Sequence, residues 1–189
     1  MRYAADHNLA TRERIVAAAA RLFREHGIAA VGLARIMAEA DLTVGTFYTH
    51  FKSKEQLVQE ALHQAGTEPF ERALRAGDLE LAIRTYLSPG HCDDPGIGCP
   101  AAALASEVAR HPRATRQKFA GNLEPRIAAF AKLLSSRRGK KVGHAEAAAF
   151  FGLLVGTVQL ARATPERAEA NEILEAGVRA ALRLAEAGA

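Results

Sequence analysis

The most restrictive feature of this sequence is the spacing of its apolar residues, which recur every three or four positions along most of the chain. One such stripe consists of Phe119, Leu123, Ile127, Phe130 and Leu134. This spacing places the apolar side chains on one face of an α-helix. No stretch alternates apolar and polar residues, and runs of β-branched residues are missing. We therefore expect an all-α protein.

Composition is consistent with a helical protein that has a substantial core. The 189 residues are 49% hydrophobic, while only 6% are aromatic and none is Trp. The segment Met1–Ala20 is charged and has no apolar stretch of the kind found in signal peptides. The longest uncharged apolar run, Ala147–Ala161, is shorter than the roughly 20 residues that a membrane span needs. With only two cysteines, these features predict a cytoplasmic protein.

Start and stop signals divide the first third of the chain into short helices. After a flexible arm over residues 1–10, Thr11 is expected to cap a helix that Gly27 ends. Thr43 is expected to cap a later helix, and Ser53 forms a capping box with Gln56 for the helix after it. The predicted helices cover residues 11–26, 32–40 and 44–51, and then Ser53 to about residue 65.

The second half of the sequence is also predicted to be helical. The segment Ser88–Cys99 is dense in turn-forming residues and is expected to be a loop, and Arg137–Lys141 is expected to be a basic loop. The predicted helices cover residues 68–75, 79–87, 100–110, 113–136, 144–162 and 165–187. The chain would then hold about nine helices in two domains. Residues 11–56, with a connecting helix to about 65, would form a three-helix helix-turn-helix domain, and residues 66–189 would form a helical bundle.

The segment Gly32–Phe51 carries the features of a helix-turn-helix. Phe47 and Phe51 are four residues apart, so both can pack inward from the second helix of the motif. Small and polar residues occupy the opposite side of that helix. Among them, Gly45 costs a helix about 1 kcal/mol relative to Ala. A close approach of the backbone to DNA would explain why the sequence accepts that cost.

Charge does not locate a nucleic-acid site in this sequence. The formal net charge is +4, which permits DNA binding without establishing it. Residues 113–141 hold nine basic side chains against one acid, Glu124, whereas residues 1–66 are nearly balanced. The basic excess thus lies outside the predicted helix-turn-helix. The motif itself has to carry the functional prediction.

The most specific pattern in the chain is Gly45-Thr-Phe-Tyr48-x-His50-Phe51-x-Ser53-Lys54-Glu55-x-Leu57. With Thr11-Arg-Glu-Arg-Ile15, Ala19-x-x-Leu22-Phe23-x-x-x-Gly27, Ile36 and Ala40, it resembles the TetR/AcrR family of one-component regulators. The resemblance covers about a third of the chain. It implies a DNA-binding regulator, with Tyr48 and Lys54 mainly as phosphate ligands. The candidate DNA-binding residues are Gly32, Thr43, Val44, Gly45, Thr46, Tyr48, His50, Lys52 and Lys54.

Three positions depart from the usual pattern of that family. A Thr-Ser pair commonly opens the second helix, where this chain has Val31-Gly32, so a hydroxyl cap is lost. The turn often contains Gly, where this chain has Asp41. A Lys or another polar residue often follows Thr43, where this chain has Val44, which can contact a thymine methyl group but cannot hydrogen bond to a base.

The same resemblance implies a homodimer that binds a near-palindromic operator in double-stranded DNA, and a pocket for a small apolar or amphipathic effector. The expected dimer interface, on the last two helices, includes Phe151, Gly152, Val155, Gly156, Leu174, Val178 and Leu182. The candidate pocket residues are Cys99, Leu104, Phe119, Leu123, Phe130, Phe150 and Leu154. Each of these seven is more readily explained as an ordinary core residue. The expected function is a ligand-responsive repressor, although activation is compatible with the same sequence.

Two alternatives involve the loop that contains the cysteines. Cys99 precedes Pro100 at a helix N-terminus, a position that can make a thiolate reactive, so the chain could be a repressor that senses oxidants or electrophiles, and a Cys92–Cys99 disulfide is compatible with their spacing. An inert, buried Cys99 is the simpler interpretation. His91, Cys92 and their neighbours fit no standard zinc spacing, so we expect neither a metal nor a cofactor.

An enzyme built on a helical bundle is a distant third alternative. The sequence contains no pair of Glu-x-x-His motifs, no phosphate-binding Gly-rich loop and no nucleophile motif. We therefore expect a regulator without catalytic residues.

Overall fold

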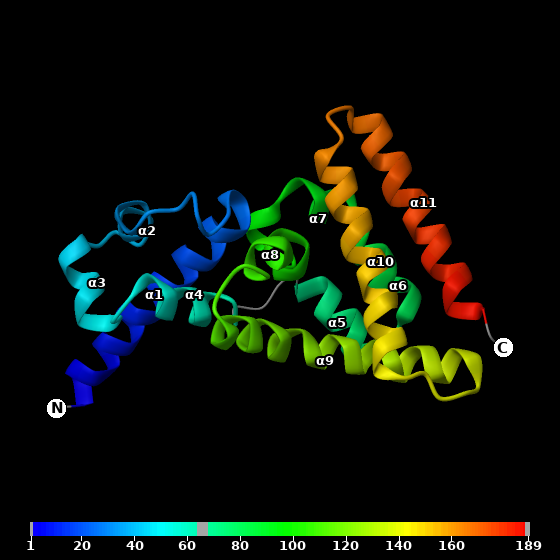
Figure 1. Cartoon of the computed structure of the whole chain (residues 1–189), viewed down its shortest axis with the longest axis horizontal. Helices are drawn as coiled ribbons and strands as arrows, with labels where there is room; N and C mark the ends of the chain where they lie inside the picture. Colours follow the sequence, from blue (N-terminus) through cyan, green and yellow to red (C-terminus); the bar gives the residue numbers. More distant parts are fainter. Residues whose placement is uncertain (1, 64–67, 188–189) are drawn as a thin grey trace. The chain divides into compact units, whose positions relative to one another are not determined.

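The structure, a computed structural model, describes residues 2–63 and 68–187, with side chains from Asn8 onward. In these residues the chain forms eleven α-helices and one short 3-10 helix, and no strand (Figure 1). The all-α prediction is thus confirmed. The number of helices exceeds the expected total of about nine, since the ranges predicted one by one already amount to ten and the segment before Cys99, expected to be a loop, contains α7.

The chain forms two compact units, which are described separately. Unit 1, called the head from here on, comprises Met1–Gln64 and Ala103–Asn122, and unit 2 comprises Ala65–Ala102 and Leu123–Ala189. The division expected from the sequence placed residues 103–122 in the second domain. The expected boundary at residues 65–66 lies outside the described part of the chain.

The head is built from α1 (Arg2–His26), α2 (Leu33–Glu39), α3 (Val44–His50) and α4 (Lys54–Ala61), drawn from blue to cyan in Figure 1. The parts of α8 (Pro100–Val108) and α9 (Arg113–Arg138) that lie within 103–122 complete it. Its core consists of fully buried apolar residues of α1 to α4, among them Ile15, Phe23, Ile36 and Leu57. Their burial follows from the helical spacing of apolar residues in the sequence.

The first helix is longer than predicted. It begins at Arg2 and not at Thr11, because residues 2–10 contain neither Pro nor Gly and Thr11 is buried within the helix. The expected arm is therefore helical from residue 2 onward. At the other end the prediction is confirmed: Gly27 has a φ of +84°, and its N–H donates to Phe23 O at 2.8 Å.

Unit 2 contains α5 (Glu68–Ala76), α6 (Leu79–Tyr86), α7 (Pro89–Asp93), the 3-10 helix η1 (Pro95–Ile97), α10 (His144–Ala163) and α11 (Arg167–Glu186). α10 and α11 form an antiparallel pair, drawn in orange and red in Figure 1. Gly177 permits their close contact, because a Cβ atom there would overlap Thr157 Cγ2 and lie 3.2 Å from Leu87 Cδ1. By length and composition alone α10 could cross a membrane, as many core helices of soluble proteins could.

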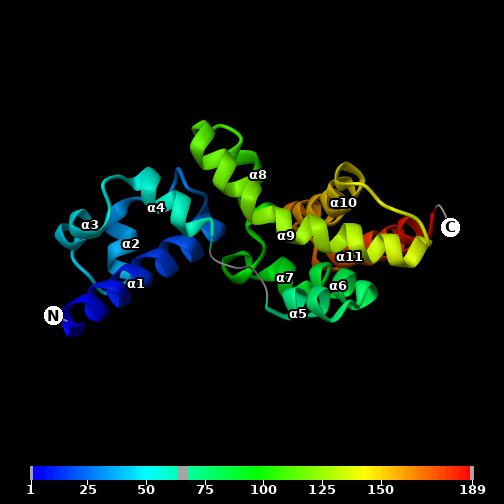
Figure 2. The same cartoon turned by 90° about the horizontal axis from the view of Figure 1, so that it is seen from below.

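A cluster of aromatic rings forms the core of unit 2. The ring centroids of Phe70 and Tyr86 are 4.9 Å apart, those of Phe130 and Phe150 are 5.3 Å apart, and Phe151 contacts both Tyr86 and Phe130. Phe70, Tyr86 and Phe130 are at most 1% exposed. These contacts join α5, α6, α9 and α10 (Figure 2).

The segment Ser88–Cys99, expected to be a loop, contains α7 and η1. Its turn-forming residues act as helix caps: Ser88 Oγ accepts from His91 N at 3.3 Å, and Asp94 Oδ1 accepts from Ile97 N at 3.3 Å. Pro89 and Pro95 occupy the first turns, where a missing N–H costs nothing. The dense turn signals therefore mark two short helices.

The expected basic loop over Arg137–Lys141 is also shorter than predicted. α9 continues through Arg138, whose guanidinium is buried and donates to Leu184 O and Ala185 O at the end of α11. A cation that binds the last carbonyls of a helix stabilises that helix end. Tertiary contacts of Arg138 thus extend α9 by two residues beyond the predicted end.

Candidate functional site

The inner face of α3 fixes this helix to the rest of the head. Phe47 and Phe51 are 0% and 2% exposed, and their rings stack with centroids 5.4 Å apart. The predicted inward pair is therefore confirmed. Because these two rings are buried, the opposite side of α3 must face solvent.

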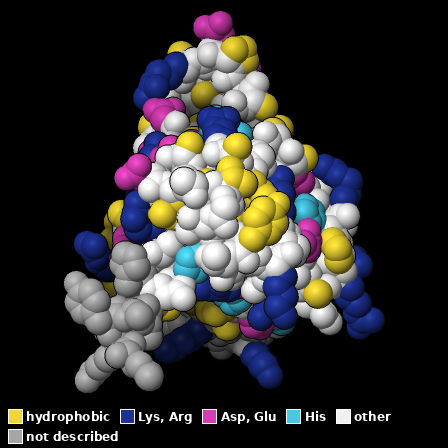
Figure 3. Space-filling view, turned by 90° about the vertical axis from the view of Figure 1, so that its left-hand side faces the viewer, with side chains coloured by type: hydrophobic (Ala, Val, Ile, Leu, Met, Phe, Trp, Pro, Cys, Tyr) yellow, Lys and Arg dark blue, Asp and Glu magenta, His cyan; other side chains and the backbone are white. Residues whose placement is uncertain are grey.

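That outer side of α3 carries little bulk and one prominent aromatic ring. Tyr48 is 68% exposed, and its ring packs edge-on against Phe47 with centroids 5.2 Å apart. Thr43, Val44 and Gly45 are exposed as well. Figure 3 shows the molecule from the side on which α3 lies in Figure 1; hydrophobic side chains and Lys and Arg side chains lie next to each other on this face.

Gly45 is not required by the fold of the head. A Cβ atom at this position would meet only Thr43 Oγ1, at 3.8 Å, which is an ordinary van der Waals contact. Gly45 also has no positive φ that would exclude other residues. The protein itself would thus accept Ala at a position where Gly weakens the helix.

The polar residues of α3 interact mainly with each other. Thr43 stands at the N-cap position, but its hydroxyl lies 3.1 Å from Thr46 Oγ1 and caps no backbone amide, so the predicted side-chain cap is wrong. Thr49 Oγ1 donates to Thr46 O at 2.7 Å. Thr46 and His50 are half-buried, so each presents only part of its side chain to solvent.

The turn between α2 and α3 explains one departure from the family pattern. Asp41 has a φ of +53°, in the left-handed region that favours Gly. Asp is one of the few other residues that enter this region readily. Arg14 also supports the turn, because its guanidinium donates to Ala40 O at 2.6 Å. Asp41 therefore keeps the turn geometry without glycine.

Arg12 positions α3 and was not singled out from the sequence. Its guanidinium donates to His50 O at the end of α3 and to the carboxylate of Glu60 on α4, and it lies 4.2 Å from the centroid of the Phe51 ring. One side chain of α1 thus holds two other helices. Its sequence signal was only its place in the Thr11–Ile15 segment, which does not distinguish a surface Arg from a buried one.

Lys54 has a structural contact that the resemblance did not indicate. Its Nζ donates to Ile28 O at 2.6 Å and lies 5.9 Å from the Phe23 ring centroid. The amine therefore holds the α1–α2 loop. Lys52, by contrast, is exposed, and its backbone N–H donates to Gln56 Oε1 at 2.8 Å. Ser53 caps α4 as predicted, with its hydroxyl accepting from Gln56 N at 3.2 Å.

Gly32 stands at the N-cap position of α2. It makes no side-chain cap, and a Cβ atom there would meet nothing within 4 Å. The position is exposed. A Ser or Thr side chain would thus fit at this place, where the family pattern commonly has a hydroxyl.

Two carboxylates attach residues 103–122 to the helix-turn-helix part of the head. Glu107 accepts from Ile28 N at 2.8 Å and from Ala29 N at 2.6 Å. Glu55, in the first turn of α4, accepts from Thr115 Oγ1, and its Oε1 lies 3.2 Å from His111 Nδ1. Part of the basic excess noted in the sequence therefore belongs to the head, on the exposed side chains of Arg113, Arg116 and Lys118.

Comparison with known proteins identifies the head. Residues 15–61 match the model described as bacterial regulatory proteins, tetR family. The chain is 44% identical over 50 residues to the uncharacterized HTH-type transcriptional regulator YerO of Bacillus subtilis, covering 26% of this chain and 17% of that protein. It is 40% identical over 70 residues to the HTH-type transcriptional regulator TtgR of Pseudomonas putida, covering 37% of this chain and 33% of that protein. These curated relatives are thus matched over a third of their length or less.

Solved structures extend the likeness to nearly the whole chain. A TetR transcriptional regulator from Chloroflexus aurantiacus is 25% identical with a TM-score of 0.70, covering 95% of this chain and 94% of that one. Residues 15–61 thus match the TetR family, and the chain as a whole shares the fold of this TetR transcriptional regulator. The reduced form of Escherichia coli NemR shares the fold at 21% identity with a TM-score of 0.73, covering 92% of this chain and 96% of that one.

The residues expected to line the effector pocket do not come together in one unit. Leu104 and Phe119 belong to the head, whereas Cys99, Leu123 and the remaining three belong to unit 2. Phe130, Phe150 and Leu154 are at most 2% exposed, and the rings of the two Phe residues pack against each other. Phe130 and Phe150 are thus part of the aromatic core of unit 2.

Cys99 is held by a buried histidine. Cys99 is 1% exposed, and its N–H donates to His91 Nε2 at 3.0 Å, while His91 Nδ1 donates to Tyr86 O at 2.6 Å. Both ring nitrogens of His91 are therefore engaged, and burial lowers its pKa to about 4. Cys92 and Cys99 are free thiols, and burial raises the pKa of Cys92. Because both thiols are buried, these surroundings do not favour an accessible, reactive thiolate.

The residues expected at the dimer interface divide into two groups. Phe151, Leu174 and Val178 are 2–4% exposed and already buried within one chain. The others, Gly152, Val155, Gly156 and Leu182, are exposed or half-buried, and a Cβ atom at either glycine would meet nothing within 4 Å. Leu160 and Leu184 add exposed apolar surface on α10 and α11, at 65% and 42% exposure.

Proposed function

We propose that this chain is a ligand-responsive repressor of the TetR family that binds a near-palindromic operator in double-stranded DNA as a homodimer. The observation that carries the proposal is the outer side of α3. There a helix-weakening Gly45, which the fold does not need, stands beside the exposed Tyr48. A helix that enters the major groove requires such a side, because its backbone must approach the bases and phosphates closely.

The individual roles follow from exposure. Tyr48, Thr43 and Lys52 are exposed and offer hydroxyl or ammonium donors to phosphate oxygens. Val44 is 41% exposed and offers methyl groups to a thymine. Thr46 and His50 are half-buried and contribute their outer atoms, and Gly32 allows a phosphate to approach the start of α2. Lys54 would have to release Ile28 O to reach a phosphate, so we assign it first to positioning the α1–α2 loop.

Dimerisation is proposed through the outer sides of α10 and α11. The open glycines Gly152 and Gly156 let a partner helix approach closely, and Val155, Leu160 and Leu184 supply apolar area around them. Leu182 is half-buried at the edge of this surface. Phe151, Leu174 and Val178 support the surface from within each protomer.

Regulation is proposed to work through an effector that prefers the DNA-incompetent conformation. Because the target is chromosomal DNA, the proposed location is the cytoplasm. Thiol-based sensing through Cys99 is the weaker proposal, since this residue is 1% exposed and its backbone is tied to His91. Activation in place of repression would use the same DNA contacts.

The experiment that tests the proposal is selection of bound fragments from the source genome, followed by binding measurements on the selected operator. Tyr48→Phe removes the exposed hydroxyl and keeps the ring on Phe47. We expect it to weaken binding about fivefold on every sequence, as the loss of one phosphate contact does. The control, Ser136→Ala, removes an exposed hydroxyl of unit 2 and should leave binding unchanged. A changed base preference in Tyr48→Phe would contradict the phosphate role, and selection of no sequence at all would contradict the proposed function.

A further inference from the structure

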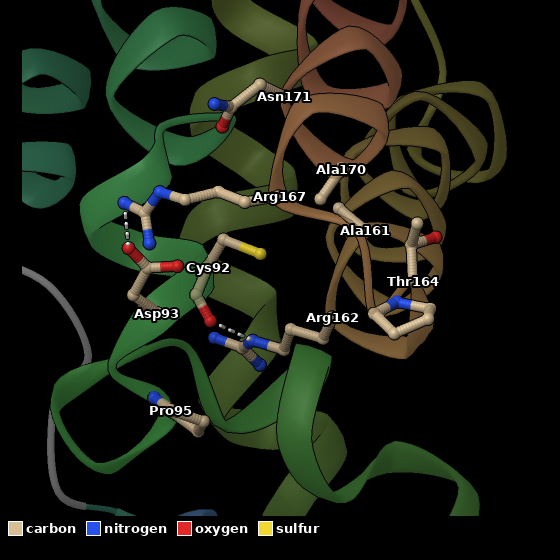
Figure 4. Close-up of a pocket in the computed structure, with 10 residues that line it drawn as sticks. Cys92, Asp93, Pro95, Ala161, Arg162, Thr164, Arg167, Ala170 and Asn171 are labelled. Carbon is tan, nitrogen blue, oxygen red and sulfur yellow. Dashed lines mark hydrogen bonds and ion pairs between the residues drawn. The ribbon is translucent and has the colours of Figure 1, made fainter.

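A cavity of about 370 Å³ lies in unit 2 where the end of α10 and the start of α11 face α7 and η1 (Figure 4). It is separate from the aromatic core and contains none of the residues expected at the effector pocket. Its volume falls in the range of small-molecule sites. Its polar lining comes from Arg162, Arg167, Asp93, Asn171 and Thr164.

The guanidinium of Arg162 is the distinctive group in this cavity. Its Nε donates to Cys92 O at 3.1 Å and one terminal nitrogen donates to His91 O at 2.6 Å. A guanidinium has five N–H donors, so three are left beyond these two bonds. In the described part of the chain no carboxylate forms an ion pair with it. Burial lowers the pKa of Arg162, and the through-space effect of Asp94, which forms no direct ion pair with it, opposes this only in part.

The remaining charges of the cavity nearly cancel. Arg167 donates to Asp93 Oδ2 at 2.7 Å, so this pair is neutral as a whole (Figure 4). Asn171 and Thr164 add neutral donors to the wall. The residues that line the cavity therefore carry a net charge of one positive unit, contributed by Arg162, while Asp94 acts on Arg162 from outside the lining. Such a site matches a ligand with a single negative charge.

The opposite wall of the cavity is apolar. Ala161 and Ala170 lie across from the guanidinium groups in Figure 4, and Pro95 and Pro165 also line the cavity. The thiol of Cys92 points toward Ala161. A ligand that has a compact hydrocarbon part beside its charge would bury that part here.

We propose that this cavity binds a small amphipathic carboxylate, with the carboxylate on Arg162 and the hydrocarbon part against Ala161 and Ala170. The carboxylate accepts from the free N–H groups of Arg162, while Asn171 keeps another part of the lining polar and uncharged. The planar fork of a guanidinium matches a planar carboxylate better than a compact ammonium group would. The ligand class follows from one unneutralised cation and an adjacent apolar wall.

This site is placed to influence the start of α8, an inference that rests on the proposed regulatory function. Arg162 holds the carbonyl groups of His91 and Cys92, and His91 in turn holds Cys99 N directly before α8. A Cβ atom on Gly98 would lie 3.0 Å from both Arg162 and His91, so this corner is tightly packed. Movement of Arg162 toward a bound carboxylate must therefore disturb these contacts. The bound and empty forms would differ in operator affinity.

Calorimetric titration of the full chain with sodium benzoate tests the binding site, with benzamide as a neutral probe of nearly the same shape. We expect benzoate to bind and benzamide to bind at least about tenfold more weakly, since only benzoate brings the charge. Raising the salt concentration should weaken benzoate binding through screening. Equal binding of both probes, or no binding of benzoate at millimolar concentration, would overturn the proposal.

Three variants locate the probe. Arg162→Gln removes the cation and should weaken benzoate binding at least about tenfold. Asn171→Asp leaves the bonds of Arg162 intact and adds a negative charge to the wall of the cavity. It should weaken benzoate binding by a similar factor, so the site can still be tested if Arg162→Gln fails to fold. Arg179→Gln is the matched control, because Arg179 is an exposed cation of α11 outside the cavity. Benzoate binding that is unchanged in Asn171→Asp would overturn the assigned site.

Operator binding separates this inference from the proposed function. Suppose the wild-type chain binds its operator and benzoate lowers the operator affinity of wild type but not that of Asn171→Asp. The proposed function and the regulatory carboxylate site are then both supported. If the chain binds its operator and benzoate binds without changing that affinity, the regulatory link fails while the proposed function stands. If benzoate binds and no operator is found, the proposed function fails while the carboxylate site stands.

Discussion

Two glycines show how the head and unit 2 use unusual residues differently. Gly45 on α3 has open space around it, and a Cβ atom would meet one oxygen at 3.8 Å. Gly177 on α11 has none, and a Cβ atom would overlap Thr157 on α10. Both residues cost their helices conformational stability. In unit 2 the cost is explained by a contact within the protein, whereas in the head no internal contact explains it.

The same contrast holds for the polar residues of the two units. Tyr48 of the head exposes its ring and hydroxyl, and Gly32 leaves a helix start uncapped. His91 of unit 2 is 3% exposed and bonded through both ring nitrogens. Tyr48 and Gly32 thus have no evident role within the fold of the head, whereas His91 has one within unit 2. Substitutions at Gly45 and Tyr48 should therefore affect DNA binding, and substitutions at Gly177 and His91 should affect stability.

The largest expected effect concerns the pH dependence of stability through His91. Its pKa is about 4 when folded and 6.5 in the unfolded chain, so below pH 6.5 the unfolded chain takes up a proton that the folded chain does not. Stability should therefore fall as the pH is lowered from 6.5 toward 4, by about 2 kcal/mol at pH 5. Denaturant unfolding of wild type and His91→Gln at pH 7 and 5 measures this difference.

The control for that experiment is His144→Gln, since the side chain of His144 is 59% exposed and pairs with the exposed Glu124. This variant should keep the wild-type pH dependence, whereas His91→Gln should lose most of it. An unchanged pH dependence in His91→Gln would show that His91 does not remain neutral in the folded state.

The next largest expected effect is the loss of stability in Gly177→Ala. The added methyl group overlaps Thr157, and overpacking of this kind typically costs 1–3 kcal/mol, so we expect a loss of about 2 kcal/mol in unfolding free energy. Gly121→Ala in α9 is the control, because its Cβ atom would meet nothing within 4 Å. Equal stability of the two variants would contradict the claim that packing within unit 2 requires glycine at position 177.

Gly45→Ala tests the other side of the contrast. We expect the unfolding free energy to rise by up to about 1 kcal/mol, because Ala favours the helix. Operator affinity should fall about tenfold, because the methyl group enters the space that DNA would occupy. Thermal unfolding and fluorescence anisotropy with a labelled operator measure the two effects. Operator affinity equal to that of wild type would remove the main argument for α3 as the reading helix.

Gly32→Ser should have the smallest effect. A hydroxyl at this N-cap position can accept a hydrogen bond from an amide of the first turn of α2. Ser at an N-cap stabilises a helix by a few tenths of a kcal/mol more than Gly does. The sequence would thereby regain the cap that the family pattern commonly has. Denaturant unfolding at closely spaced concentrations measures the gain, and a lower stability would show that Gly32 has a conformational role after all.

Much of the head was predictable because its signals are local. The Phe47/Phe51 pair, the end of α1 at Gly27 and the Ser53 cap each depend on residues within four positions of each other. The role of Lys54 was not predictable, since its carbonyl partner Ile28 is 26 residues away. Arg12 was missed for the same reason, as it bonds to residues 38 and 48 positions later.

The sequence by itself determined the all-α class, most helix positions and the TetR-type helix-turn-helix, because helical periodicity and capping are properties of short segments. Tertiary structure alone decided that residues 103–122 belong to the head, through Glu107 and Glu55. It also decided that Arg162 lines a cavity without a carboxylate partner among the described residues. Ion pairs and cavities form between segments far apart in the chain, so the spacing of residues in the sequence does not predict them.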